Sequence, residues 1–180
     1  MTGSGSAVIT ETTDPARANR SVQVVWGMLH DLKRGTAATP SPGLGGYWHP
    51  NAFWYRSTRL GTARSRTAIT TKIPRQFRDG LSDNTRHLDD GVFFGDRNLV
   101  AFTGWPSGTA THTGDGFLKL TPTGRRTTHR SLDFWRVEND LIRECWVMID
   151  MPDLYRQLGS DVFARMASLC NSPQQTEAAA

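Results

Sequence analysis

The fold is decided by one stretch of the sequence, Pro122–Gly159, which reads PTGRRTTHRSLDFWRVENDLIRECWVMIDMPDLYRQLG. Two of its segments, RTTHRSLDFWRV and LIRECWVMID, alternate residue by residue, as a β-strand with two different faces does. In the first of them, Asp133 and Trp135 share one face. The residues Glu138-Asn139-Asp140 separate the two segments, so the spacing predicts an antiparallel hairpin.

Further strands are expected upstream of this hairpin. HLDDGVFFG and NLVAFTGWPS flank Asp96-Arg97, which is typical of a tight turn, and TATHTGDGFLKL gives a third run before Pro122. A short strand is also expected at 52–56, within an aromatic-rich segment. The sequence thus predicts a bent antiparallel sheet of about five or six strands.

Helical spacing appears at both ends of the chain. An amphipathic helix is expected from Ser21, a suitable N-cap, because apolar residues then recur every three or four positions, at Val22, Val25, Trp26, Leu29 and Leu32. A second helical patch holds Ile69, Ile73 and Phe77, and Pro74 is expected to break or kink it. Pro152 and Gly159 stand where a short last helix would start and stop.

This order of elements, helices and then antiparallel strands, is typical of an α+β domain with about three helices against the concave face of the sheet. The N-terminal residues 1–18 are rich in Thr, Gly and Ser and are interpreted as a flexible arm. A single domain is expected over 19–170, followed by a flexible tail at 171–180.

Composition narrows the class of partner. The 180 residues carry a net charge of +4, with 21 Lys and Arg against 17 Asp and Glu, and the basic residues are scattered. Clustered basic residues interleaved with aromatic ones, as nucleic-acid binding requires, are absent from the sequence. No apolar run is long enough to cross a bilayer, and no signal peptide is recognisable, so a cytoplasmic protein with no membrane partner is expected.

The ordered elements of Pro122–Gly159 resemble a known family. A PTG turn, a strand, an acidic hairpin, the pattern Ile-x-Glu-x-Trp-x-x-x-Asp and a helix that ends in Gln-Leu-Gly are similar to the C-terminal half of SnoaL-like polyketide cyclases. The resemblance implies the cone-shaped fold of the nuclear transport factor 2-like superfamily and a homodimer packed through its sheet. It also implies acid/base chemistry on a small hydrophobic or aromatic molecule without a cofactor.

One departure from the family pattern concerns the reacting groups. As aligned here, the acid/base aspartate of the family's aldol cyclases falls at Val147 and their assisting histidine falls at Asp133. The cyclase pair is therefore not present as such, and Asp133 is the residue that could take over the acid/base role.

Three titratable residues are the catalytic candidates. Asp133 is expected to face the pocket, where desolvation would raise its pKa, although it could instead lie at the surface beside Arg130 or Arg143. Asp150 ends the last strand and could be reactive at the rim or could cap the following helix. His112 is expected to be the nearest titrating partner of Asp133.

Aromatic residues and two further histidines are the candidates for substrate binding, because flat indole rings suit flat ligands. Ordinary core packing is the alternative for them, as it is for Trp26 on the first helix. The predicted binding set is Trp48, His49, Trp54, Trp105, His129, Trp135 and Trp146.

Three functions follow as hypotheses. The first is a cyclase, isomerase or dehydratase that moves a proton on a hydrophobic carbonyl compound. The second is an epoxide-hydrolase-type enzyme with two carboxylates and an Arg around one water, and the third is a non-catalytic binding or dimerisation module. The sequence lacks the glycine-rich motifs of nucleotide sites, the G-x-S-x-G elbow and metal-binding histidine spacing, so no cofactor and no metal are expected.

Overall fold

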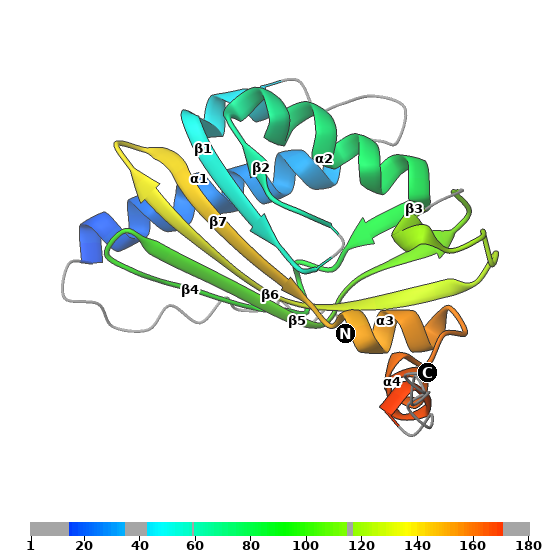
Figure 1. Ribbon diagram of the computed structural model, residues 1–180. Helices are drawn as coiled ribbons and strands as arrows, with labels where there is room; N and C mark the ends of the chain where they lie inside the picture. Colours follow the sequence, from blue (N-terminus) through cyan, green and yellow to red (C-terminus); the bar gives the residue numbers. More distant parts are fainter. Residues whose placement is uncertain (1–14, 35–42, 59, 115–116, 171–180) are drawn as a thin grey trace, which may run out of the picture.

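The computed structural model describes residues 15–34, 43–58, 60–114 and 117–170. These residues form four α-helices, two short 3-10 helices and seven strands (Figure 1). The helices are α1 (Pro15–Arg34), α2 (Arg66–Gly80), α3 (Met151–Gln157) and α4 (Val162–Cys170), and the 3-10 helices are η1 (Leu44–Tyr47) and η2 (Phe117–Lys119). The strands are β1 (Trp48–Arg56), β2 (Ala63–Arg64), β3 (Leu81–Arg86), β4 (Val92–Asp96), β5 (Leu99–His112), β6 (Arg126–Glu138) and β7 (Leu141–Ile149).

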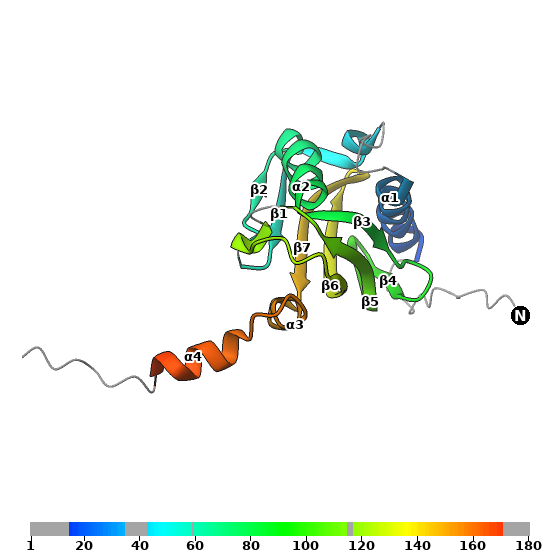
Figure 2. The same cartoon turned by 90° about the vertical axis from the view of Figure 1, so that its right-hand side faces the viewer.

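All seven strands belong to one strongly curled sheet, in the order β2-β1-β7-β6-β5-β3, with β4 paired to β5. The sheet bends around α1 and α2, which cover its concave face (Figures 1 and 2). This arrangement confirms the predicted cone-shaped α+β fold. One pair, β1 with β7, is parallel, which the sequence did not predict because no hairpin joins these two strands.

The predicted alternation on β6 is present in the structure. Residues Thr127, His129, Ser131, Asp133, Trp135 and Val137 are all buried, and the residues between them are partly or fully exposed. The buried set faces α1 and α2 with the main hydrophobic core, which includes Met28, Leu29 and Ile69. The β6–β7 turn has the predicted residues, with positive φ at Asn139 and Asp140, as a two-residue hairpin turn needs.

Several expected boundaries were wrong. Helix α1 begins at Pro15, so Ser21 lies inside it, and α2 continues past Pro74 to Gly80. Strand β3 was not predicted, and the TATH run is the second half of β5 beyond an irregularity at 104–108. The predicted tail at 171–180 lies outside the described residues, as do residues 1–14 of the predicted arm.

Helices α3 and α4 lie outside the concave face. Strand β7 stops pairing with β6 at Ser131, and α3 lies along the edge that remains free. There the side-chain amide of Gln157 accepts a hydrogen bond from Thr128 N (2.8 Å) and donates one to Thr128 O (3.0 Å), as a neighbouring strand would. Helix α4 projects away from the sheet (Figure 2).

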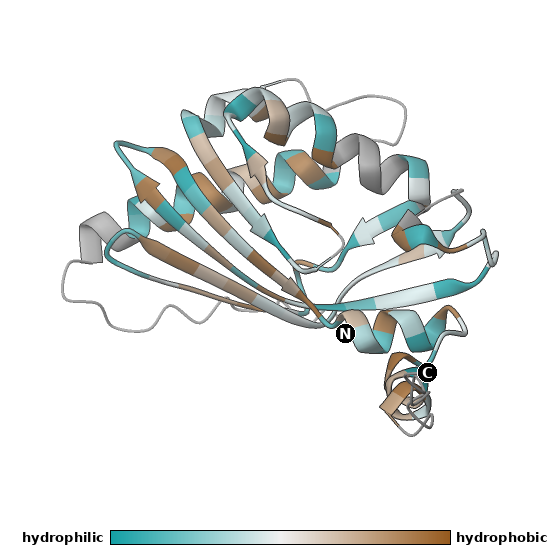
Figure 3. Cartoon of the chain, viewed as in Figure 1, coloured by the Kyte–Doolittle hydropathy of each residue, from teal (hydrophilic) through white to brown (hydrophobic). Residues whose placement is uncertain are grey.

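The convex face of the sheet carries an apolar row. Cross-strand register places Tyr55, Trp146, Phe134, Ala101 and Phe94 side by side on five neighbouring strands. Hydrophobic segments accordingly appear on the strands as well as on the helices (Figure 3). Within the described ranges, no helix is both long and apolar enough to cross a membrane.

Candidate functional site

The candidate site is built around Asp133, at the middle of the concave face of β6. Its side chain is fully buried, with 0% exposure. Register places Phe102 of β5 on one side and Val147 of β7 on the other, so its closest strand neighbours are apolar. Its charge is met by Arg86 of β3, whose Nη2 donates to Asp133 Oδ2.

Strand β3 brings Arg86 to this position. Arg86 is in register with Gly108 of β5, and Gly108 is in register with His129 of β6. A Cβ on Gly108 would lie 2.6 Å from Thr85 O, so this close approach of β3 to β5 requires glycine. From there the Arg86 guanidinium lies over the ring of Phe102, 5.7 Å from its centroid, and reaches Asp133.

The environment of Asp133 has two opposing effects on its acidity. Burial raises the pKa of the Asp133 carboxyl, because the charged form loses water, and the positive charge of Arg86 lowers it. Burial is the larger effect, so the pKa of Asp133 lies above its ordinary value. A carboxylate with a raised pKa in a dry interior is suited to act as a general base.

Polar atoms around Asp133 are left without partners. Asp133 Oδ1, Arg86 Nε and the indole Nε1 atoms of Trp48, Trp54 and Trp135 are buried with no hydrogen-bond partner among the described residues. Trp54 and Trp135 both flank Cys145 in one cross-strand row, next to the row that holds Asp133 and about 7 Å from it. Each unpaired buried group costs about 1–3 kcal/mol, so these groups make the concave face the candidate for ligand binding.

His129 contributes a neutral imidazole to the same face. Burial, with the positive charge of Arg86, lowers the pKa of His129 to about 4. The Thr127 hydroxyl donates its one proton to Ala110 O (3.2 Å), so it can only accept from His129 Nε2 (3.3 Å). The proton of His129 is therefore assigned to Nε2, and its Nδ1 carries the lone pair.

The predicted pairing of His112 with Asp133 does not form. His112 is buried at the far end of β5, where its backbone N–H donates to Arg125 O (2.9 Å) and its Nδ1 accepts from Thr123 N (3.3 Å). Asp133 lies eight residue steps from Arg125 along the chain, about 26 Å of extended strand. The ion partner of Asp133 is Arg86 instead.

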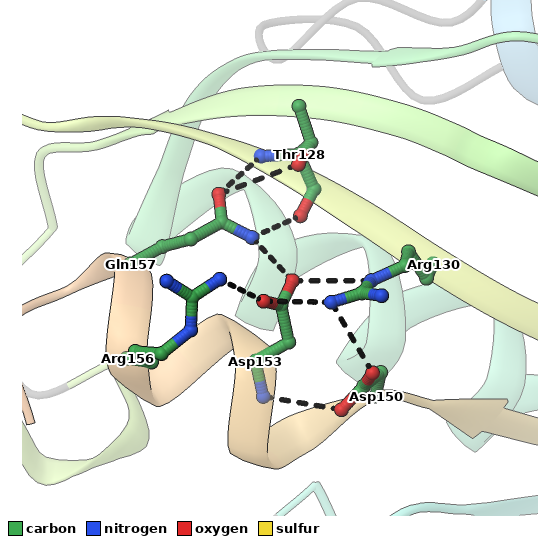
Figure 4. A network of polar contacts seen from close by, with 6 residues as sticks. All are labelled: Thr128, Arg130, Asp150, Asp153, Arg156 and Gln157. Atoms are coloured by element: carbon green, nitrogen blue, oxygen red, sulfur yellow. Dashed lines mark hydrogen bonds and ion pairs between the residues drawn. The ribbon is translucent and has the colours of Figure 1, made fainter. Parts of the chain in front are cut away.

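Asp150 caps α3 on the other side of β6, as its alternative interpretation predicted. Its Oδ1 accepts from Asp153 N (3.1 Å), and its Oδ2 lies 3.5 Å from Arg130 Nη2. Figure 4 shows this network, in which Asp153 also contacts Arg156 and Gln157. Hydrogen bonds from Arg130 and Arg156 are the largest effects that lower the pKa of Asp153, to about 2, so these charges fix α3 to the sheet.

Four of the predicted binding residues lie on the concave face and three do not. Trp48, Trp54, His129 and Trp135 are buried there, with Trp48 stacked on Trp54 at 5.3 Å. Trp105 is 72% exposed and its ring lies 4.5 Å from the Arg130 guanidinium, because its neighbour Gly104 faces inward opposite Ser131 and strand alternation turns Trp105 outward. Trp146 stacks on Tyr55 on the convex face (5.9 Å), and His49 Nδ1 lies 3.2 Å from Arg143 Nη1.

A shallow pocket of about 240 Å³ lies on the outer side, between β5, β6 and α3. Its lining residues are Trp105, Pro106, Thr128, Arg130, Asp153, Arg156 and Gln157. Its buried carboxylate, Asp153, is already engaged by Arg130, Arg156 and Gln157. In the part of the chain that the structure describes, the unpaired Asp133 Oδ1 and Trp135 Nε1, which a ligand could satisfy, are on the concave face instead.

Comparison with known proteins identifies the family of the chain. A family model described as SnoaL-like polyketide cyclase matches residues 41–158. The chain belongs to this family. The match includes β1, β3, β6 and β7, and therefore Arg86, Asp133 and all the concave tryptophans.

Solved structures agree on the fold of this SnoaL-like protein. An NTF2-like protein from Burkholderia thailandensis E264 is 18% identical, with a TM-score of 0.60 over 77% of this chain and 96% of that one. One from Burkholderia xenovorans LB400 is 17% identical, with a TM-score of 0.59 over 78% and 97%. TsrD from Streptomyces laurentii is 20% identical, with a TM-score of 0.58 over 77% and 96%. At these identities the likeness shows the fold alone, and no curated protein matches the chain.

Arg86 is the site residue that sequence reasoning missed. It ends a strand with little apolar alternation, LSDNTR, which gives no periodic signal. The available signal was the glycine at 108, since a glycine inside a strand pattern marks close backbone approach.

Proposed function

We propose that this protein is a SnoaL-like enzyme that moves a proton on a hydrophobic carbonyl compound, with Asp133 as the general base. The observation that carries the proposal is a fully buried carboxylate whose Oδ1 has no hydrogen-bond partner among the described residues, on a sheet face that also holds unpaired indole N–H donors. An acceptor-bearing ligand would satisfy those donors, and a carbonyl oxygen is such an acceptor.

The proposed step uses side chains of the concave face. Asp133 Oδ1 takes a proton from the carbon beside the carbonyl, and the electron pair moves to the carbonyl oxygen to give an enolate. The Nε1–H of Trp135, two residues along the same face, donates to that oxygen as its charge develops. In a cyclase the enolate carbon then attacks a second carbonyl, whose oxygen takes the proton back from Asp133. In an isomerase the substrate is an unsaturated ketone, and Asp133 returns the proton to the far carbon of the conjugated dienolate.

Burial defines how a substrate reaches the base. Asp133 has no exposed surface, whereas the side chain of Arg86 is 21% exposed. Solvent therefore reaches Arg86 but stops short of the carboxylate, and a substrate has to displace side chains packed against Asp133. Once bound, it would be held among tryptophans in a water-poor site, where charge stabilisation is strong.

The two other hypotheses have weaker support. A hydrolase of the predicted kind needs a second carboxylate beside the first, and Asp150 is engaged with Arg130 and α3 rather than with Asp133. A binding module was expected to have its pocket polar groups satisfied structurally, and within the described ranges Asp133 Oδ1, Arg86 Nε and three indole nitrogens have no partner.

Proton abstraction is testable before the substrate is known. A panel of monocyclic and polycyclic aryl ketones is incubated with the protein in D2O, and loss of the signal of the hydrogen beside the carbonyl is followed by proton NMR. Asp133→Asn should slow exchange about 10²–10⁴-fold, the usual contribution of a general base. Asp150→Asn is the matched control and should leave exchange unchanged. Equal exchange with Asp133→Asn and wild type would refute the proposal.

A further inference from the structure

The pair formed by Arg86 and Asp133 joins two strands that are not neighbours. Arg86 lies on β3 and Asp133 on β6, with β5 between them, and 47 residues separate them in the sequence. The guanidinium crosses β5 over the Phe102 ring and donates through Nη2 to Oδ2 of the carboxylate. Oδ2 is thereby occupied while Oδ1 stays free.

The Ser131 hydroxyl also lowers the pKa of Asp133, but the other groups that face Asp133 leave its charge to Arg86. On its own strand, His129 is neutral because its pKa is lowered to about 4. On β7, burial raises the pKa of the Cys145 thiol, so that residue is also uncharged, and Val147 is apolar. On β5 the neighbour is Phe102, and the inward residues of α1 and α2 belong to the hydrophobic core, as Met28, Leu29, Ile69 and Ile73 do.

A carboxylate in such surroundings would not stay ionised by itself. Moving a lone charge into an apolar interior costs so much that the group takes up a proton instead. A protonated Asp133 could not act as a base. Its ionised form thus depends on a cation held in contact, and Arg86 supplies one in a fixed orientation.

We propose that Arg86 is the positioning residue of the site: it favours the ionised form of Asp133 and holds Oδ2, so that Oδ1 is left for the substrate. The proposal rests on the proposed function, in which Asp133 is the base, and it names the residue that favours the deprotonated form of this base. The pair itself stands on geometry alone.

The titration of Asp133 tests the pair directly. The carboxyl carbon of Asp133 is followed by carbon-13 NMR against pH in the wild type, in Arg86→Gln and in Arg97→Gln. Arg97, at the β4–β5 turn, pairs with Asp96 beside it, so its replacement removes the same charge from the surface. Arg86→Gln should move the Asp133 midpoint upward by at least about one pH unit, and Arg97→Gln should not move it. An unmoved midpoint in Arg86→Gln would overturn the proposal.

A second variant covers the case in which Arg86→Gln does not fold. Arg86→Lys keeps the charge but loses the planar fork, so the midpoint should rise by about half a pH unit, and no rise would count against the proposal. In the deuterium-exchange assay the acidic limb of the pH profile should move upward with the midpoint, because the base works only when deprotonated. If the midpoint moves but Asp133→Asn exchanges as fast as the wild type, the pair is real and the proposed function is what fails.

Discussion

Replacement of Trp135 by Phe separates a catalytic donor from a core residue. Trp135 is 1% exposed, and its Nε1 has no partner in the described part of the chain. The smaller ring loses packed atoms, at a cost of about 1–2 kcal/mol, a value in the range of small core truncations. Removing the unpaired N–H restores about 1–3 kcal/mol. The two effects nearly cancel, so the melting temperature should change by no more than roughly 4 °C.

The effect on proton transfer should be much larger. Loss of one donor to a developing oxyanion costs about 10²–10³ in rate, so Trp135→Phe should slow deuterium exchange by that factor. Trp146→Phe is the matched control, because Trp146 stacks on Tyr55 on the convex face and has no place in the site. Thermal melts and exchange rates are measured on the same samples. A Trp135→Phe variant that exchanges normally but melts far lower would show that Trp135 is a core residue only.

Three further predictions concern charge, assembly and the position of the base. The pKa of Asp133 is raised above the unfolded value of about 3.9, so the folded state binds this proton more tightly than the unfolded state does. The wild type should therefore lose stability relative to Asp133→Asn as the pH rises from about 4 through the native pKa. Melting temperatures of the two proteins that run parallel between about pH 4 and 8 would contradict this. The convex face, where Phe134 is 36% and Met148 56% exposed, should pair two copies. Light scattering should therefore give twice the mass of one chain for the wild type and the mass of one chain for Phe134→Asp; a monomeric wild type would refute this. Adding Val147→Asp to the Asp133→Asn variant should restore part of the deuterium exchange, since register puts the two positions side by side. No recovery would contradict this and would show that a carboxylate on β7 cannot replace one on β6.

The fold was predictable where local pattern determined it. Strands β6 and β7 alternate clearly, and the Glu138-Asn139-Asp140 turn fixes their pairing, so this half of the sheet follows from the sequence. The β1–β7 pair is set by how the sheet closes around α1 and α2, and no local pattern reports that. Helix α2 continues across Pro74 for a related reason: Ile69 and Ile73 are buried against the sheet, and tertiary packing outweighs a local breaking signal.

The site was predictable only in part, for the same physical reason. Alternation correctly placed Asp133, His129 and Trp135 on one buried face, because the side-chain period of a strand is fixed. The same alternation puts Trp105 on the outer face, because Phe102 and Gly104 pair with inward residues of β6, so the prediction of Trp105 as a pocket residue did not follow from the pattern. It could not find Arg86, whose role depends on a contact across an intervening strand.

The register of β6 and β7 relates the resemblance to the structure. The family's cyclases, as aligned here, have their acid/base aspartate at the position of Val147, and in this protein Val147 is directly opposite Asp133, with both side chains buried on the concave face. A carboxylate at either position therefore lies in the same cross-strand row, next to the row that holds Trp54 and Trp135. What differs is the surroundings: on β6 the carboxylate is within reach of Arg86 from β3. The chain thus has an acidic group beside the position where the family's cyclases have theirs, and Arg86 offsets part of the effect of burial on its pKa.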